Sequence, residues 1–230
     1  MLNWVPMLLL GASAELGQVL FFDPGQGRHG VACSDCHAPR EDEGSGLLRA
    51  GHPLFGAAGR PHWRGDAGKR TYPTLADAIA PCARIYQGAA RPDPESLAAI
   101  AAYLTGLGGK SRRPPLELQP DLRADGDYAQ PRFLSGRPGP GRTLFYRACH
   151  SCHPHGTKEG LGGVLAGLPA DRIVAKVREG TGLLRGAREP GAWMPFYGTD
   201  RLSDEQLAHI VAFIGALPPP DEDPNSEPSR

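Results

Sequence analysis

Apolar residues recur with the same spacing near the middle and near the end of the chain. Leu97 and Leu207 are each followed by apolar residues three, four, seven and ten positions later. Such offsets place each series on one face of an α-helix. The two series are Leu97, Ile100, Ala101, Leu104 and Leu107, and Leu207, Ile210, Val211, Ile214 and Leu217. The chain therefore contains an internal repeat, and a helix closes each half.

Both expected helices have clear start signals. Asp93 is placed as an N-cap, with Pro94 at the first helical position. Ser203 and Gln206 have the spacing of a capping box. A glycine pair follows the first helix and a proline run follows the second, so both helices are expected to stop there.

Each half also begins with an apolar and aromatic segment, Leu16–Phe22 in the first and Thr143–Arg147 in the second. No segment alternates with the period of a β-strand, so the sequence predicts an all-α protein. Two tandem domains with long irregular loops are expected. Their expected boundaries are a signal-like segment 1–14, a first domain 15–109, a linker 110–141, a second domain 142–218 and a disordered tail 219–230.

Composition narrows the class of protein. The 230 residues include 25 basic and 25 acidic side chains, so the charge gives no reason to expect nucleic acid or a membrane surface as a partner. Only 40% of residues are hydrophobic, while Gly (31) and Pro (24) are abundant. Such a low share of hydrophobic residues gives a small core, which favours a bound apolar group that would complete the core of each half.

The N-terminus resembles an export signal. An apolar run, Trp4–Gly11, is followed by Ala12-Ser13-Ala14, which fits an A-x-A cleavage site. The run is too short for a stable membrane span. It lacks a basic leading region, so both cleavage and weak anchoring stay open. A periplasmic or other extracytoplasmic location is expected.

The pattern Cys-x-x-Cys-His occurs twice, at Cys33-Ser34-Asp35-Cys36-His37 and at Cys149-His150-Ser151-Cys152-His153. It is the attachment signature of c-type haem, in which two thiols bind the porphyrin and the histidine binds its iron. A redox dithiol, half a zinc site and a disulfide are alternatives for a Cys-x-x-Cys pair. None of them requires the adjacent histidine or predicts the frame twice. Two covalently bound haem c groups are therefore expected.

The second half offers one distal iron ligand. Met194 is the only methionine outside the N-terminal segment, and it lies thirteen residues before Leu207. A thioether ligand at this place is typical of His/Met cytochromes and raises the reduction potential. The sequence predicts His153 and Met194 as the ligands of the second haem.

The first half has no methionine beyond the N-terminal segment, and His52, His62 and Cys82 are its candidates. Cys82 lies fifteen residues before Leu97 and 45 after His37, against thirteen and 41 for Met194. This correspondence favours Cys82. A thiolate there would be deprotonated by the metal. His52 as the ligand, and Cys82 as a buried spectator thiol, stay open.

The order helix, Cys-x-x-Cys-His, long loop, terminal helix resembles the class I cytochrome c fold. Within residues 15–108, the stretches Thr74–Arg84 and Glu95–Leu104, with Gly88 between them, resemble the SoxA and thiosulfate dehydrogenase cytochromes. That resemblance implies Cys82 as distal ligand and Arg84 as a candidate for holding a sulfur oxyanion. The second half resembles a generic His/Met cytochrome c such as SoxX.

A second resemblance leads to a different enzyme. Leu16–Pro24 and Lys69–Leu75 are similar to di-haem cytochrome c peroxidases of the MauG type, in which a histidine soon after the first motif ligates iron. His52 would suit that role. However, the peroxidatic haem of that family is open on its distal side, whereas Met194 is expected to close the second site here.

The sequence thus predicts an exported di-haem electron-transfer protein. It is expected to oxidise a small anionic sulfur compound such as thiosulfate at the first haem, and to pass electrons through the second to a soluble cytochrome or a terminal oxidase. The alternatives are an electron-transfer subunit without a substrate of its own and, third, a MauG-like peroxidase. Arg60, Arg64, Lys69 and Arg70 form a basic stretch that fits either an anion site or a solvated loop.

Overall fold

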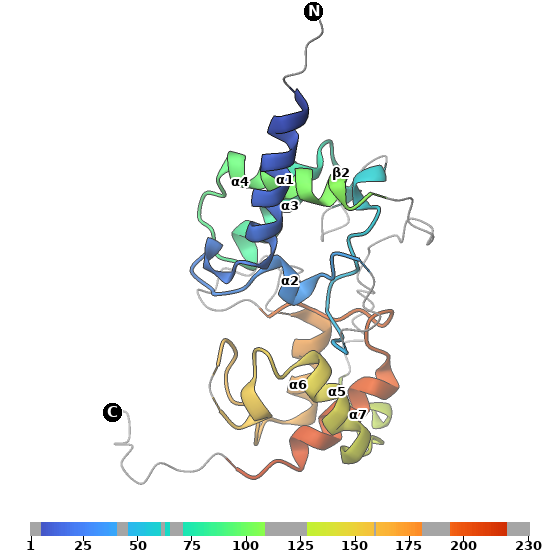
Figure 1. Cartoon of the computed structure of the whole chain (residues 1–230). Coiled ribbons are helices and arrows are strands. Elements are labelled where there is room, and N and C mark those ends of the chain that lie inside the picture. The colour runs from blue at the N-terminus through green and yellow to red at the C-terminus, as the bar shows by residue number, and fades with distance from the viewer. Residues whose placement is uncertain are drawn as a thin grey trace, which may run out of the picture. The chain divides into compact units, whose positions relative to one another are not determined.

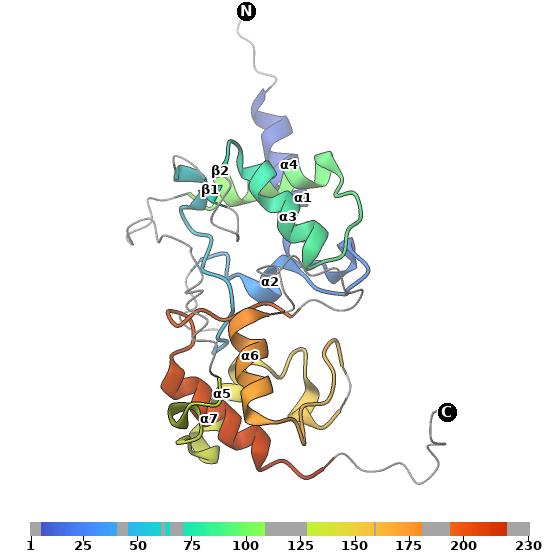
Figure 2. The same cartoon turned by 180° about the vertical axis from the view of Figure 1, so that it is seen from behind.

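The computed structural model describes residues 6–40, 46–60, 63–64, 71–108, 128–158, 160–180 and 194–219. These residues divide into two compact units. Unit 1 takes its described residues from Met1–Ala124 and Lys176–Leu202, and unit 2 takes them from Asp125–Ala175 and Ser203–Arg230. Figures 1 and 2 show both units as helices joined by long irregular segments.

Unit 1 is built around the crossing of α1 (Pro6–Phe22) and α4 (Pro94–Gly106) (Figure 1). Gly17 lies at this crossing, where a Cβ would overlap the carbonyl oxygen of Ala99. Its lack of a side chain allows the two backbones to touch. One turn later Phe21 is fully buried and packs against the ring of Tyr103 at 5.5 Å. This crossing forms the core of the first half.

Short elements connect α1 to α4 in unit 1. They are η1 (Pro24–Gln26), α2 (Cys33–Cys36), η2 (Ala57–Gly59), β1 (Trp63–Arg64), β2 (Thr71–Tyr72) and α3 (Leu75–Ile85). The two strands pair antiparallel over two residues each. Strands this short leave no alternation in the sequence, which explains why they were not predicted. They do not alter the all-α class.

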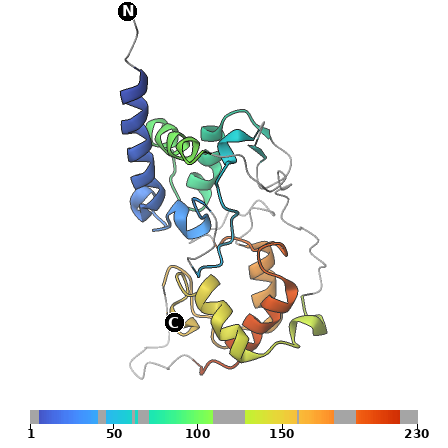
Figure 3. The ribbon, with the colours of Figure 1, turned by 45° about the vertical axis from the view of Figure 1, so that its right-hand side comes forward.

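Unit 2 repeats the crossing. Its described elements are η3 (Pro131–Phe133), α5 (Pro138–Ala148), η4 (Pro154–Gly156), the first residues of α6 (Ala170–Glu179) and α7 (Asp204–Gly215). α5 packs along α7 (Figure 3). A Cβ on Gly141 would overlap the carbonyl oxygen of His209, two residues into the apolar series, as Ala99 is in unit 1. Phe145 is fully buried one turn after this glycine and packs against Phe213 at 5.2 Å. The same glycine and aromatic positions therefore carry both crossings.

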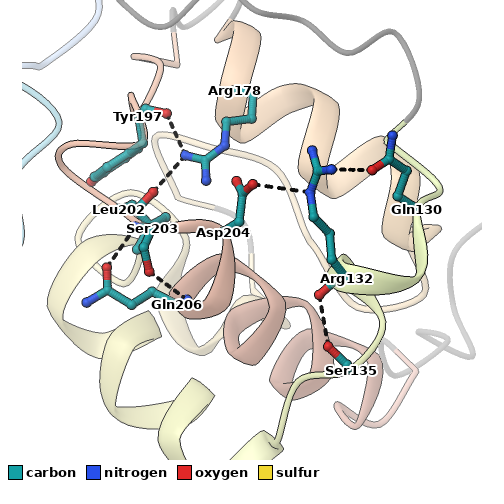
Figure 4. Close-up of polar contacts among 9 residues, drawn as sticks. All are labelled: Gln130, Arg132, Ser135, Arg178, Tyr197, Leu202, Ser203, Asp204 and Gln206. Atoms are coloured by element: carbon teal, nitrogen blue, oxygen red, sulfur yellow. Dashed lines mark hydrogen bonds and ion pairs between the residues drawn. The ribbon is translucent and has the colours of Figure 1, made fainter.

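The helix caps expected from the sequence are present. The Asp93 carboxylate accepts from the Ser96 N–H at 2.9 Å. Ser203 and Gln206 make both bonds of a capping box, as Figure 4 shows. The prediction of an all-α protein is confirmed.

Several helices are longer than expected, or were not expected at all. The helix of residues 16–22 begins at Pro6, and the helix of residues 143–147 begins at Pro138, inside the expected linker. α3 and α6 (Ala170–Glu179) fall in segments expected to be irregular loops. α6 has its first residues in unit 2 and its last in unit 1. None of the helices among the described residues has the length and apolar character needed to cross a membrane.

Candidate haem-binding sites

The two Cys-x-x-Cys-His motifs adopt the same local turn. α2 covers the first pair of cysteines, and the Asp35 carboxylate caps it by accepting from the Ala32 N–H at 2.8 Å. The backbone N–H of His37 donates to the carbonyl of Cys33 at 2.9 Å, and that of His153 donates to the carbonyl of Cys149 at 2.9 Å. Each histidine thus follows one helical turn that brings its two thiols to the same side.

A backbone carbonyl orients each histidine ring. His37 Nδ1 lies 2.7 Å from the carbonyl oxygen of His52, and His153 Nδ1 lies 2.8 Å from that of Gly163. A carbonyl only accepts, so Nδ1 carries the proton and donates it. In the neutral ring Nε2 is then the unprotonated nitrogen, which is the one that can ligate a metal. Burial also lowers the pKa of His153, which favours its neutral form.

A glycine packs against each of these rings. Gly51 donates its N–H to the carbonyl of Cys36, and Gly162 donates to that of Cys152, both at 2.8 Å. A Cβ on either glycine would overlap the imidazole of His37 or His153 respectively. The return of the chain past the histidine therefore requires glycine at both sites. The same three hydrogen bonds, two to carbonyls of the motif and one from the histidine ring, occur in both halves.

The environment of the thiols argues against a reactive dithiol. Burial raises the pKa of Cys33 to about 11 and that of Cys149 to about 12. Redox-active and metal-binding cysteines have lowered pKa values. Half-buried neutral thiols beside an oriented histidine instead fit thioether attachment of a porphyrin, with Nε2 as its iron ligand.

Cys82 lies on α3, on the face that packs toward the first motif. Leu75, Ile79 and Cys82 have the spacing of one helix face, and Leu75 and Ile79 pack against the same core cluster as Cys33. The other described members of this cluster are Phe21, Ile100, Leu104, Leu20, Leu54, Tyr103 and Leu107. Cys82 is half-buried. Its helix face therefore packs against the core cluster that Cys33 also contacts.

Gln87 ties the end of α3 to that motif. It follows Cys82 by a little more than one turn, and its side chain is 5% exposed. Its amide donates to the carbonyl of Val31 at 3.1 Å and to Cys33 Sγ at 3.7 Å. Its own carbonyl accepts from the His29 N–H at 3.0 Å. Sequence reasoning missed this residue, because a glutamine after a helix carries no motif.

The structure does not bring Arg84 together with Cys82. Residues two apart on a helix point to nearly opposite sides, and α3 is helical at both positions. Arg84 is exposed, whereas Cys82 is half-buried. A sulfur oxyanion held by Arg84 would therefore lie away from the Cys82 sulfur.

His52 lies on the proximal side of the first histidine. Its carbonyl accepts from His37 Nδ1, the atom that points away from an iron bound at Nε2. Its own Nε2 is paired with Asp200 Oδ2 at 2.6 Å. In this geometry His52 is not placed to be the distal ligand of an iron bound at His37 Nε2, which removes the support that His52 gave to the MauG-like interpretation.

Met194 lies in an irregular segment of unit 1, half-buried. Gly180, the residue after α6, has a φ of +64°, and a Cβ there would lie 2.7 Å from the carbonyl oxygen of Met194. Close approach to this segment thus requires glycine. Three other candidate residues, His62, Lys69 and Arg70, lie outside the described residues, as does the side chain of Arg64. Arg60 is described, and burial lowers its pKa.

The comparisons with known proteins concern mainly the second half of the chain. Residues 136–214 match the family model described as Cytochrome C oxidase, cbb3-type, subunit III. A search of curated proteins found no match. Among solved structures, the as-isolated thiosulfate dehydrogenase (TsdBA) from Marichromatium purpuratum is similar at 18% identity and a TM-score of 0.41. The alignment covers 96% of this chain and 49% of that one, so the chain spans about half of its length. Residues 136–214 therefore form a cytochrome c family domain, a class of domain that carries covalently bound haem and transfers electrons.

Proposed function

We propose that the chain is an exported di-haem c-type cytochrome, with one haem in each of the segments 15–109 and 142–218. The observation that carries this proposal is the shared frame of the two histidines. In both halves the ring donates Nδ1–H to a carbonyl, a glycine packs against it, and two half-buried thiols precede it. A haem c iron in such a frame exchanges one electron between its ferric and ferrous states.

For the first site we propose His37 and Cys82 as iron ligands. The shared face of Leu75, Ile79 and Cys82, and the tie from Gln87 to Cys33, support this assignment. For the second site we propose His153 and Met194. A thiolate lowers the potential of its iron relative to a thioether, so electrons would leave the first site for the second.

The first site is proposed to oxidise a small anionic sulfur compound such as thiosulfate. Joining two sulfur anions through an S–S bond releases two electrons, and two haems accept one each. Support comes from the likeness of residues 15–108 to the SoxA and thiosulfate dehydrogenase cytochromes. A soluble cytochrome or a terminal oxidase would be the acceptor.

A second candidate function is electron transfer without a substrate of its own. The position of Arg84 favours it, because α3 directs the exposed Arg84 side chain away from Cys82. The matched domain at residues 136–214 is also an electron-transfer domain by class.

Thiosulfate-dependent reduction of the purified haem-loaded protein separates the two functions. Reduction of both haems within a catalytic turnover time is expected for the enzyme, and its loss in Cys82→Ala supports the first site as the place of oxidation. No reduction by thiosulfate, with normal reduction by dithionite, would leave the carrier function alone. Electron paramagnetic resonance of Cys82→Met tests the ligand separately, since a spectrum like wild type would exclude thiolate ligation.

A further inference from the structure

Two segments about 150 residues apart in the sequence are hydrogen-bonded side by side within unit 1. Residues 48–52 follow the first motif, and residues 197–201 follow Met194. The bonds join Tyr197 Oη to Leu48 O at 3.2 Å, Arg201 Nε to Arg49 O at 3.0 Å, and His52 Nε2 to Asp200 Oδ2 at 2.6 Å. We call residues 197–201 the brace.

The brace is itself fixed. Arg178 on α6 donates to the carbonyls of Tyr197 and Leu202, both at 2.8 Å (Figure 4). The Tyr197 N–H donates to the carbonyl of Val177 at 2.7 Å. Tyr197 is 6% exposed. A segment held at both ends in this way can support a neighbouring loop.

The loop that the brace supports carries the carbonyl that orients His37. One residue, His52, makes both contacts, since its carbonyl accepts from His37 Nδ1 and its ring pairs with Asp200. At the second site the corresponding carbonyl belongs to Gly163, which has no side chain to be held. The contact through a side chain is thus particular to the first site.

We propose that Asp200 is a positioning residue for the first proximal histidine, acting through His52. By fixing the His52 ring it fixes the carbonyl that accepts from His37, and this hydrogen bond makes the imidazole a stronger electron donor. This inference rests on the proposed function, since it takes His37 as an iron ligand.

The test is a redox titration of the full-length, haem-loaded protein with each haem followed by its own spectrum. In Asp200→Ala the His52 carbonyl is held less firmly, so its hydrogen bond to His37 weakens. The His37 imidazole then stabilises ferric iron less, and the first haem becomes easier to reduce. We expect about a tenfold shift of its ferric/ferrous equilibrium, which is about 59 mV upward for one electron. The second haem is expected to keep its potential.

Removing the Asp200 carboxylate also changes the local electrostatic field. A double-mutant cycle with His52→Ala therefore isolates the effect of the hydrogen bond between His52 and Asp200. If Asp200 acts through His52, Asp200→Ala adds nothing in the His52→Ala background. An undiminished shift in that background would show a field effect alone and overturn the proposal, as would no shift in Asp200→Ala. Asp171→Ala, an exposed acid in the first turn of α6, is the charge control.

Tyr197→Phe provides a variant without a change of charge. It removes only the bond to the Leu48 carbonyl, and it should move the first haem in the same direction by a smaller amount. Should Asp200→Ala fail to load haem, this variant decides the question, and an unmoved first potential would overturn the proposal. Failure of the proposed function looks different, because the wild-type protein would then lack the spectrum of a first haem.

Discussion

Gly162 packs against the imidazole ring of His153, with no room for a Cβ between them. Gly163, the next residue, has nothing within 4 Å of the position its Cβ would take, although its carbonyl is the one that His153 contacts. The structure therefore requires glycine at position 162, whereas position 163 has room for a side chain.

Gly162→Ala should displace the His153 ring and weaken its hold on iron, whereas Gly163→Ala should not. Overpacking of this kind costs about 1–3 kcal/mol in the folded protein. Visible spectra of the reduced protein, with urea unfolding, measure both effects. Equal behaviour of the two variants would contradict the proximal geometry.

Gly141→Ala tests the helix crossing of unit 2. The added methyl would meet the backbone of His209, so α5 and α7 must separate and the free energy of unfolding should fall by about 1–3 kcal/mol. Gly139→Ala, in the same helix with open space around it, creates no such overlap and should lower the free energy of unfolding less. Thermal unfolding of the two variants gives the comparison, and an equal fall in both would argue against a close crossing.

Gln87→Leu should lower the free energy of unfolding by about 1–3 kcal/mol, because it leaves the buried carbonyl of Val31 without this donor. It should also alter the spectrum of the first haem, since the tie to Cys33 is lost. Gln18→Leu, on an exposed position of α1, is the control. A stability and spectrum like wild type in Gln87→Leu would remove Gln87 from the support of the first site.

Asp93 should make the stability of unit 1 depend on acid. Hydrogen bonds from the side chain and N–H of Ser96 hold the pKa of Asp93 below its usual 3.8. The unfolded chain therefore takes up this proton first as the pH falls. The stabilisation is present above about pH 4 and is lost as the pH falls through the folded value.

Asp93→Asn retains a capping side chain without the titration. The stability difference between wild type and Asp93→Asn should thus shrink between about pH 6 and about pH 3. Urea midpoints at each pH measure it. A difference that stays constant over this range would show that the carboxylate charge contributes nothing at the cap.

The repeat of the terminal helices was predictable because apolar spacing and capping residues are local signals. The crossing glycines were equally visible in principle, since Gly17 and Phe21 repeat as Gly141 and Phe145. Only the partner helix, however, shows what a glycine approaches. α3 was missed because Pro81 lies inside it, and a proline usually ends a helix.

The residues of the candidate sites likewise fall into two groups, those marked by a local sequence signal and those recognised only in the folded structure. The motifs mark the thiols and histidines by sequence alone, but Gly51, Gly162 and Gln87 act through contacts that only folding brings about. His52 shows the limit most clearly. Its distance along the chain allowed a distal role, and the direction of its carbonyl toward His37 Nδ1 argues against it.

The intact mass of the denatured, acid–acetone-extracted protein tests the central claim most directly. Two covalent porphyrins should add the mass of two haems to the polypeptide, and replacing Cys149 and Cys152 with alanine should remove one of them. A wild-type mass equal to that of the bare polypeptide, or to that of the polypeptide with a single haem, would contradict a di-haem protein.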